Sequence, residues 1–158
     1  MITVRFETGE EREIDRESLI GACFDGGNFH RAIFEGMNLR EARFCNANLR
    51  NANFDKCDLE GGKLANAALM NSSFSLAKLM SADFSWTVAA YADFSYADLR
   101  GAIFEGADIG GASFRNANLC GANLLCKRIE EADFSEATFD DLTVWPVGFN
   151  PANAVAKK

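Results

Sequence analysis

Few side chains of this 158-residue chain have the types and spacing that catalysis or metal binding requires. The only histidine, His30, follows Phe29 at a position expected to face solvent, so no site with several histidines can form. The cysteines are odd in number, form no C-x-x-C pair and therefore indicate reduced thiols; they stand at positions 23, 45, 57, 120 and 126. No phosphate-binding loop, dinucleotide-binding glycine pattern or nucleophile elbow occurs. The sequence predicts no enzyme, with no catalytic residue, no metal site and no cofactor.

Net charge and hydropathy restrict the partners and the compartment. The chain has 16 Lys and Arg against 23 Asp and Glu, a net charge of −7 that disfavours direct binding to nucleic acid. The acidic N-terminal stretch lacks the apolar core of a signal peptide, and no apolar run approaches the length of a membrane span. We therefore expect a cytoplasmic protein that binds neither nucleic acid nor a membrane.

The aspartates that remain as candidates for chemistry share one position in a pattern. Each immediately precedes a large apolar residue, and the set comprises Asp83, Asp93, Asp98, Asp108 and Asp133. At such positions a short carboxylate side chain can accept a hydrogen bond from a nearby backbone amide in a turn. These residues are therefore interpreted as structural, and the pattern that contains them has to be explained.

That pattern is a repeat of five residues. Every fifth residue from Leu19 to Phe149 is apolar, and 13 of the 14 phenylalanines fall on these positions. Alanine stands two residues earlier at 17 of 24 positions from 22 to 137. A period of five matches neither an α-helix nor a β-strand, so the chain must turn a corner every five residues.

A second period, of 20 residues, sets the number of sides. Phenylalanine recurs at this interval at Phe34, Phe54, Phe74, Phe94, Phe114 and Phe134, and leucine recurs from Leu19 to Leu119. Four five-residue sides therefore make one coil, and like residues stack in columns. Residues 19–139 make about six coils, whose core contains the six phenylalanines.

The segments ANLRNANF, ADFSYADLRGAIF and ASFRNANLCGANL resemble the A-[DN]-[LF]-x-x motif of the pentapeptide-repeat family. The resemblance implies an all-β fold, a right-handed quadrilateral β-helix, over residues 18–143. Alternating apolar residues in 1–17 predict a strand or hairpin that caps the first coil. The C-terminal sequence TVWPVGFNPANAVAKK resembles the T-x-W-P-x-G-F-x-P tails of bacterial and cyanobacterial members. Residues 144–158 are expected to form a C-terminal cap and tail, in which Trp145 and Phe149 cap the last coil.

Lys127 departs from the pattern, because it stands where the repeat requires a small inward-facing residue. Burial of an unpaired ammonium group is very costly. The sequence therefore predicts that residues 125–128 bulge out of the repeat, or that Lys127 reaches solvent near the capped end.

Large apolar residues gather at outward-facing positions of the middle coils. The candidate protein interface comprises Met70, Leu76, Trp86, Val88, Tyr91 and Tyr96. Exposed aromatic residues and methionine are typical of interface cores. We therefore predict a non-enzymatic protein-binding or scaffold module, and the sequence leaves open whether the partner is another protein or a second copy. Trp86 either turns inward over the small residue Ala89 or points outward, and its corner position favours the outward arrangement.

The alternative function is that of a DNA mimic that inhibits or protects a type II topoisomerase such as gyrase, as the family resemblance implies for some members. A DNA mimic needs a continuous acidic surface. The outward columns of this chain mix charges, with Lys78 between Asp58 and Asp98. The sequence therefore favours the protein-binding module over the topoisomerase inhibitor.

Overall fold

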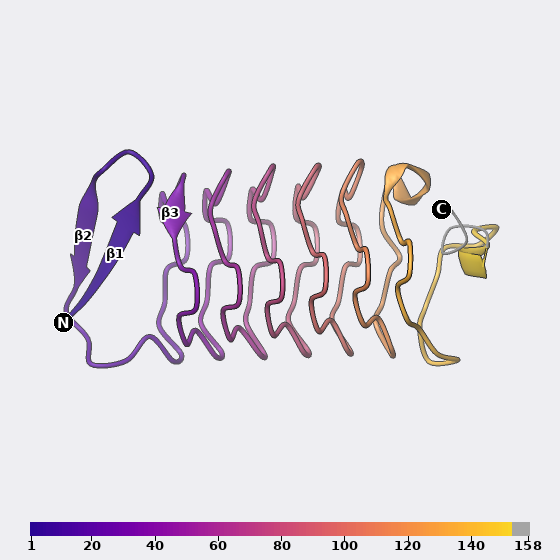
Figure 1. The fold of residues 1–158 in the computed structure, drawn as a ribbon, viewed down its shortest axis with the longest axis horizontal. Coiled ribbons are helices and arrows are strands. Elements are labelled where there is room, and N and C mark those ends of the chain that lie inside the picture. Colours follow the sequence, from indigo (N-terminus) through magenta and orange to yellow (C-terminus); the bar gives the residue numbers. More distant parts are fainter. Residues whose placement is uncertain (153–158) are drawn as a thin grey trace.

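The computed structural model describes residues 1–152. Most of them form a stack of coils, with an N-terminal hairpin at one end of the stack (Figure 1). Parallel bridges join residues 20 apart in successive coils, as between Ala68 and Val88 and between Val88 and Asp108. Each coil has four sides. In the coil formed by residues 82–101, residues 82–84, 87–89, 92–94 and 97–99 lie on faces that we name A, B, C and D.

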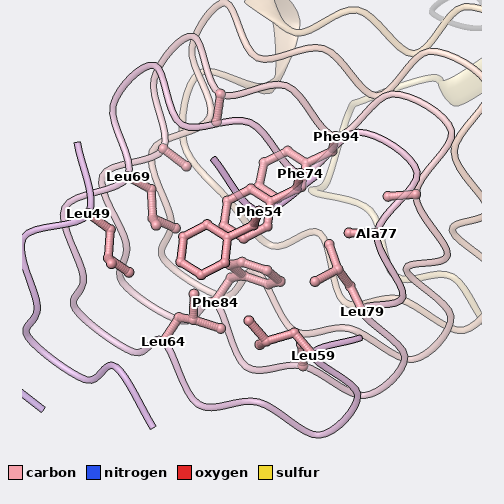
Figure 2. Packing of buried hydrophobic residues seen from close by; sticks show 14 of the residues in the cluster. Leu49, Phe54, Leu59, Leu64, Leu69, Phe74, Ala77, Leu79, Phe84 and Phe94 are labelled. Carbon is pink, nitrogen blue, oxygen red and sulfur yellow. The ribbon is translucent and has the colours of Figure 1, made fainter. Parts of the chain in front are cut away.

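Stacked aromatic rings fill the interior along face C. The ring centroids of Phe54 and Phe74 are 4.8 Å apart and those of Phe74 and Phe94 are 5.1 Å apart (Figure 2). This spacing equals the usual distance between hydrogen-bonded strands, so one ring is added with each coil. The six phenylalanines of this column are Phe34, Phe54, Phe74, Phe94, Phe114 and Phe134, and all have no solvent exposure.

The corners between faces have a left-handed backbone conformation. Each corner is a turn in which, for example, the amide of Ala92 donates to the carbonyl oxygen of Ala89 at 3.1 Å. The second corner residue has a φ near +60°, as at Asn66 (61°) and Gly106 (69°). Glycine and asparagine are favoured at such positions because they tolerate the left-handed region best.

The predicted structural role of the aspartates is confirmed. The Oδ1 atoms of Asp83 and Asp93 accept hydrogen bonds from the amides of Ser85 and Ser95 at 3.0 and 2.8 Å. Asp98, Asp108 and Asp133 accept the equivalent bond from the residue two positions later. These carboxylates therefore stabilise corners.

A three-stranded sheet closes the N-terminal end. Its strands are β1 (Ile2–Phe6), β2 (Glu11–Ile14) and β3 (Ala32–Ile33), arranged in the order β2-β1-β3. Strand β1 pairs antiparallel with β3, which belongs to face C of the first coil. Val4 and Phe6 are buried against the core, so the hairpin covers the apolar end of the stack.

Aromatic residues cover the other end. The ring of Trp145 meets Phe134, the last member of the phenylalanine column, edge-on at 5.5 Å, and Phe149 lies 6.1 Å from the same ring. Both residues therefore lie where a cap is expected. The last six residues of the predicted tail segment 144–158 fall outside the described residues.

The repeat is irregular at Lys127, as predicted. Asp108 bridges to Lys127, 19 residues later, and the 3₁₀ helix η1 (Ile129–Glu131) restores the register. Lys127 is exposed, and Cys126 instead packs against the core. An unbroken five-residue repeat would place Cys126 outward or at a corner, but the one-residue shift moves it to the inward position. Among residues 1–152, helical structure is confined to η1 and residues 151–152.

Candidate protein-binding surface

Five of the six candidate interface residues are exposed. The exposed fractions are 65% for Tyr91, 59% for Tyr96, 55% for Trp86, 53% for Leu76 and 42% for Val88, whereas Met70 is half-buried. Trp86 therefore points outward, as its corner position suggests, and does not fill the space beside Ala89.

The three aromatic residues stand at three consecutive corners of one coil. Trp86 lies between faces A and B, Tyr91 between faces B and C, and Tyr96 between faces C and D, as the sides of the coil require. Trp86 and Tyr91 therefore flank face B, with Val88 between them. Tyr96 and Leu76 share the next corner round, so the six candidates do not form one flat surface.

The backbone at these corners is unfavourable for large side chains. The φ angles of Trp86, Tyr91 and Tyr96 are 59°, 60° and 61°, in the left-handed region that bulky residues rarely adopt. In the preceding coil, the corners equivalent to Trp86 and Tyr91 contain Asn66 and Asn71, which tolerate this conformation, whereas the corner equivalent to Tyr96 contains Leu76. The conformation is common to the corners of the repeat, and for a bulky residue it costs of order 1 kcal/mol.

Glycines of the next coil accommodate the two rings beside face B. A Cβ atom added to Gly106 would lie 2.3 Å from Cε3 of Trp86, and one added to Gly111 would lie 2.5 Å from Cε1 of Tyr91. The rings therefore lie directly over these glycines. Neither contact was predicted from the sequence, although the 20-residue spacing places each glycine directly after its aromatic residue in the column.

Face B is uncharged in the middle coils. Residues 65–71 and 85–91 form this face and its corners in two successive coils, and neither stretch contains a charged residue. The outward residues of face B there are Ala68 and Val88. An uncharged strip that has aromatic borders in one of its two coils resembles an interface core in composition.

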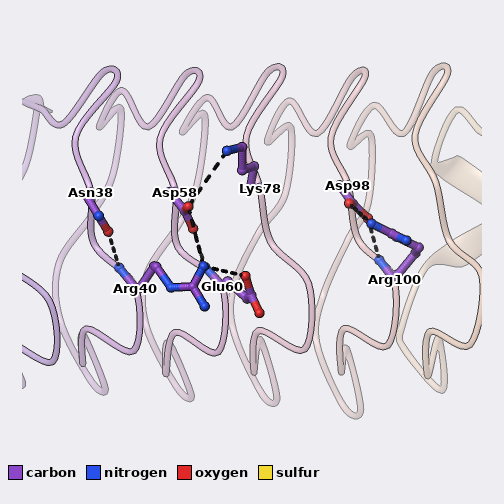
Figure 3. Close-up of polar contacts among 7 residues, drawn as sticks. All are labelled: Asn38, Arg40, Asp58, Glu60, Lys78, Asp98 and Arg100. Carbon is purple, nitrogen blue, oxygen red and sulfur yellow. Dashed lines mark hydrogen bonds and ion pairs between the residues drawn. The ribbon is translucent and has the colours of Figure 1, made fainter.

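Face D, on the opposite side of the coil, is instead covered by ion pairs (Figure 3). Nη1 of Arg40 lies 2.9 Å from Oε2 of Glu60. Nζ of Lys78 lies 3.9 Å from Oδ2 of Asp58, and Nη2 of Arg100 lies 2.6 Å from Oδ2 of Asp98. The hydrogen bond from the Arg100 guanidinium is the main cause that lowers the pKa of Asp98. These groups are partly exposed and their charges are mutually compensated, so face D has no continuous acidic surface.

Residues that could support other chemistry are dispersed. Nε2 of His30 lies 3.2 Å from Nδ2 of Asn51, which is a surface contact. Burial raises the pKa of the Cys126 thiol to about 12 and that of Cys57 further, so both are poor nucleophiles. Within residues 1–152, no group of three or more His, Cys, Asp or Glu side chains is placed to hold a metal ion.

Two surface depressions lie near the hairpin, far along the stack from the aromatic corners. One, of about 460 Å³, is lined by residues that include Arg5, Ile33 and Lys56, and the other, of about 220 Å³, includes Ile2 and Leu19. Neither contains any of the predicted interface residues. The helical segments of the described chain are too short to cross a bilayer.

Sequence and structure comparisons agree on the repeat. A family model for pentapeptide repeats matches eight copies in residues 38–75, 69–106, 77–116 and 112–142. No functionally curated protein matches the chain.

Solved structures share the fold. HetL, a pentapeptide repeat protein involved in heterocyst differentiation regulation in the cyanobacterium Nostoc, is 27% identical with a TM-score of 0.71. The match covers 78% of this chain and 57% of HetL, so this chain spans little more than half the length of that protein. QnrB1, a plasmid-mediated fluoroquinolone resistance protein, is 17% identical with a TM-score of 0.51 over 81% of this chain and 86% of QnrB1. At that identity the likeness shows the fold alone. These matches confirm the all-β, right-handed quadrilateral β-helix.

Proposed function

We propose that this chain, which belongs to the pentapeptide-repeat family, is a protein-binding module. Its interior is filled by apolar side chains, so only its surface is available for recognition. Its binding surface is the apolar strip of face B between Trp86 and Tyr91, with Val88 between them and Met70 in the preceding coil. One observation carries the proposal: large aromatic residues occupy corner positions where the backbone favours Gly or Asn, and they remain exposed.

The position of the strip supports this function. Exposed aromatic rings that are rigidly attached to a scaffold are the residues that most often dominate binding energy. Ion pairs cover face D, whereas Trp86 and Tyr91 remain 55% and 65% exposed. A partner that covers face B would remove this apolar surface from water.

The chain itself suggests the variant that tests the proposal. Asn46 and Asn66 precede Trp86 in its column, and Asn51 and Asn71 precede Tyr91. The double variant Trp86→Asn/Tyr91→Asn should therefore fold normally while it loses both rings. We expect the wild type, but not this variant, to retain a protein from a lysate of the source cells.

A photo-crosslinking amino acid in place of Val88 locates the contact. The matched control places the same group at Lys78, which also lies at an outward strand position but on face D. Crosslinking from position 88 alone supports the proposal. Equal crosslinking from both positions, or capture by the asparagine variant at the wild-type level, contradicts it. Ser81→Asn, at a corner remote from face B, is the matched control for the substitution itself.

The structure favours the topoisomerase alternative less. DNA mimicry requires a dense and continuous negative surface, but the carboxylates of face D are paired with Arg40, Lys78 and Arg100. An assay of gyrase supercoiling with and without the protein tests this alternative directly. Inhibition that survives the substitution of both aromatic residues would favour it over binding through face B.

A further inference from the structure

The ring of Trp86 contacts more of the stack than its own coil. It lies over Gly106 in the next coil, where an added Cβ atom would be 2.3 to 2.6 Å from three ring carbons. The ammonium nitrogen of Lys127, one coil further, lies 5.7 Å from the ring centroid. This separation is within the range of about 6 Å over which a cation is attracted to an aromatic face. Trp86 therefore connects three successive coils at one corner.

Lys127 reaches the ring because the repeat slips at this point. Val88 and Asp108 are bridged at an interval of 20 residues, but Asp108 and Lys127 are bridged at 19. The shift places Cys126 inward and brings Lys127 to the outward column of face B. The neighbouring Arg128 binds Asp108 at 2.9 Å, whereas Lys127 takes part in none of the ion pairs of residues 1–152. Its ammonium group is therefore free to interact with the ring.

We propose that Lys127 is a positioning residue that, together with Gly106, holds the ring of Trp86 in one orientation beside face B. The ammonium group attracts the ring, and the missing Cβ atom of Gly106 leaves the space in which the ring lies. A side chain that is ordered before binding loses less conformational entropy when a partner covers it. This purpose rests on the proposed function, but the orientation of the ring is a property of the free protein.

Nuclear magnetic resonance of the free protein tests the orientation. The ammonium nitrogen of Lys127 lies 5.7 Å from the centroid of the Trp86 ring, so we expect the ring current to shift the adjacent Lys127 methylene protons upfield from those of the other lysines. Trp86→Asn should abolish the shift. In a Trp145→Phe background, fluorescence anisotropy measures the mobility of Trp86 alone. Lys127→Arg should keep Trp86 ordered, whereas Lys127→Met should increase the mobility of Trp86.

Two glycines provide a matched pair. Gly106 and Gly121 both have a φ of 69°, but an added Cβ atom at Gly121 would find only a backbone nitrogen, at 3.9 Å. Gly106→Ala and Gly121→Ala therefore impose the same backbone strain. We expect only Gly106→Ala to remove the upfield shift of Lys127 and to mobilise Trp86.

Lys127 methylene protons without an upfield shift, or equal responses to the two glycine substitutions, overturn the inference whatever the lysate experiment gives. Failure of the proposed function has a different signature. In that case the ring of Trp86 is ordered by Lys127, but the asparagine variant captures the same proteins as the wild type.

Discussion

At the scale of single residues, Phe94 shows what the interior contributes. Its ring stacks on Phe74 and Phe114 at 5.1 and 5.0 Å and meets Phe84 and Phe104 edge-on at 5.4 Å. If this ring were removed, its neighbours could not shift to fill the cavity, because the repeat fixes the layers above and below.

We therefore expect Phe94→Ala to lower the free energy of unfolding by about 3–5 kcal/mol, measured by urea denaturation. The control is Arg100→Ala on face D, which should cost under about 0.5 kcal/mol, since its ion pair with Asp98 is half exposed. Similar losses at both positions would mean that the assignment of inward and outward positions is incorrect.

The Arg100–Asp98 pair also predicts a dependence on pH. The Arg100 guanidinium holds the pKa of Asp98 below its ordinary value, so the folded state binds this proton less readily than the unfolded state. The stabilisation that ionised Asp98 contributes is therefore complete above the pKa of Asp98 in the unfolded chain, about 3.9. It is lost as the pH falls through the lower pKa of Asp98 in the folded state. Asp98→Asn should lower the free energy of unfolding at pH 7 by less than about 1 kcal/mol, and the difference should shrink below about pH 4. A constant difference across this range would contradict the assignment.

At the scale of the structural element, the corner determines which residues are tolerated. The φ of Tyr96 is 61°, and asparagine occupies the equivalent position of the next coil at Asn116. Left-handed conformation costs most for β-branched residues and least for Gly and Asn.

Tyr96→Asn should therefore leave the free energy of unfolding unchanged or raise it by about 0.5 kcal/mol, whereas Tyr96→Val should lower it by about 1–2 kcal/mol. Urea denaturation of the two variants measures the difference directly. A large loss in the asparagine variant would show that the ring of Tyr96 stabilises the coil and is not kept for recognition.

The coils could be predicted from the sequence because one period specifies both burial and turning. The five-residue repeat predicted the buried Phe74 and Phe94 and the turn-forming Asp83 and Asp93, and the structure agrees. The position of Cys126 could not be predicted, since the free energy of a one-residue slip depends on the neighbouring coil.

The side-chain contacts of the candidate surface also could not be predicted from the sequence. The spacing placed Trp86 at a corner, but the direction of its ring depends on the space over Gly106 and on the position of Lys127. Both are set by coils that follow Trp86 in the chain. Periodicity thus predicts which residues are exposed, whereas side-chain contacts between coils require coordinates.

At the scale of the whole molecule, two opposite faces of the stack are chemically different. Face D is covered by ion pairs, and face B is apolar in the middle coils. Because the solenoid is extended, each coil contacts mainly its neighbours, and a surface can be changed on one face without disturbing the others. This arrangement suits a scaffold that recognises a partner along one face.

The size of the apolar strip bears on whether that partner is a second copy. A stable interface involves about 20–30 residues on each side. The strip offers few large apolar side chains, namely Trp86, Val88, Tyr91 and the half-buried Met70, and the adjoining coil carries Asp108 and Lys127. A two-fold contact centred on Val88 would also cover these charged groups of both copies, at a cost in desolvation. We therefore expect a different protein to bind here.

Light scattering over a hundredfold range of concentration should accordingly give the mass of a single chain, 17.3 kDa, at every dilution. In a Trp145→Phe background, the fluorescence maximum of Trp86 should remain that of an exposed indole, because no second copy covers the ring. The Trp86→Asn variant should have the same mass as the wild type. A larger species that dissociates on dilution and is abolished by Trp86→Asn would instead identify face B as a self-association surface, and the loss of the ring would then act through oligomerisation rather than through a separate partner.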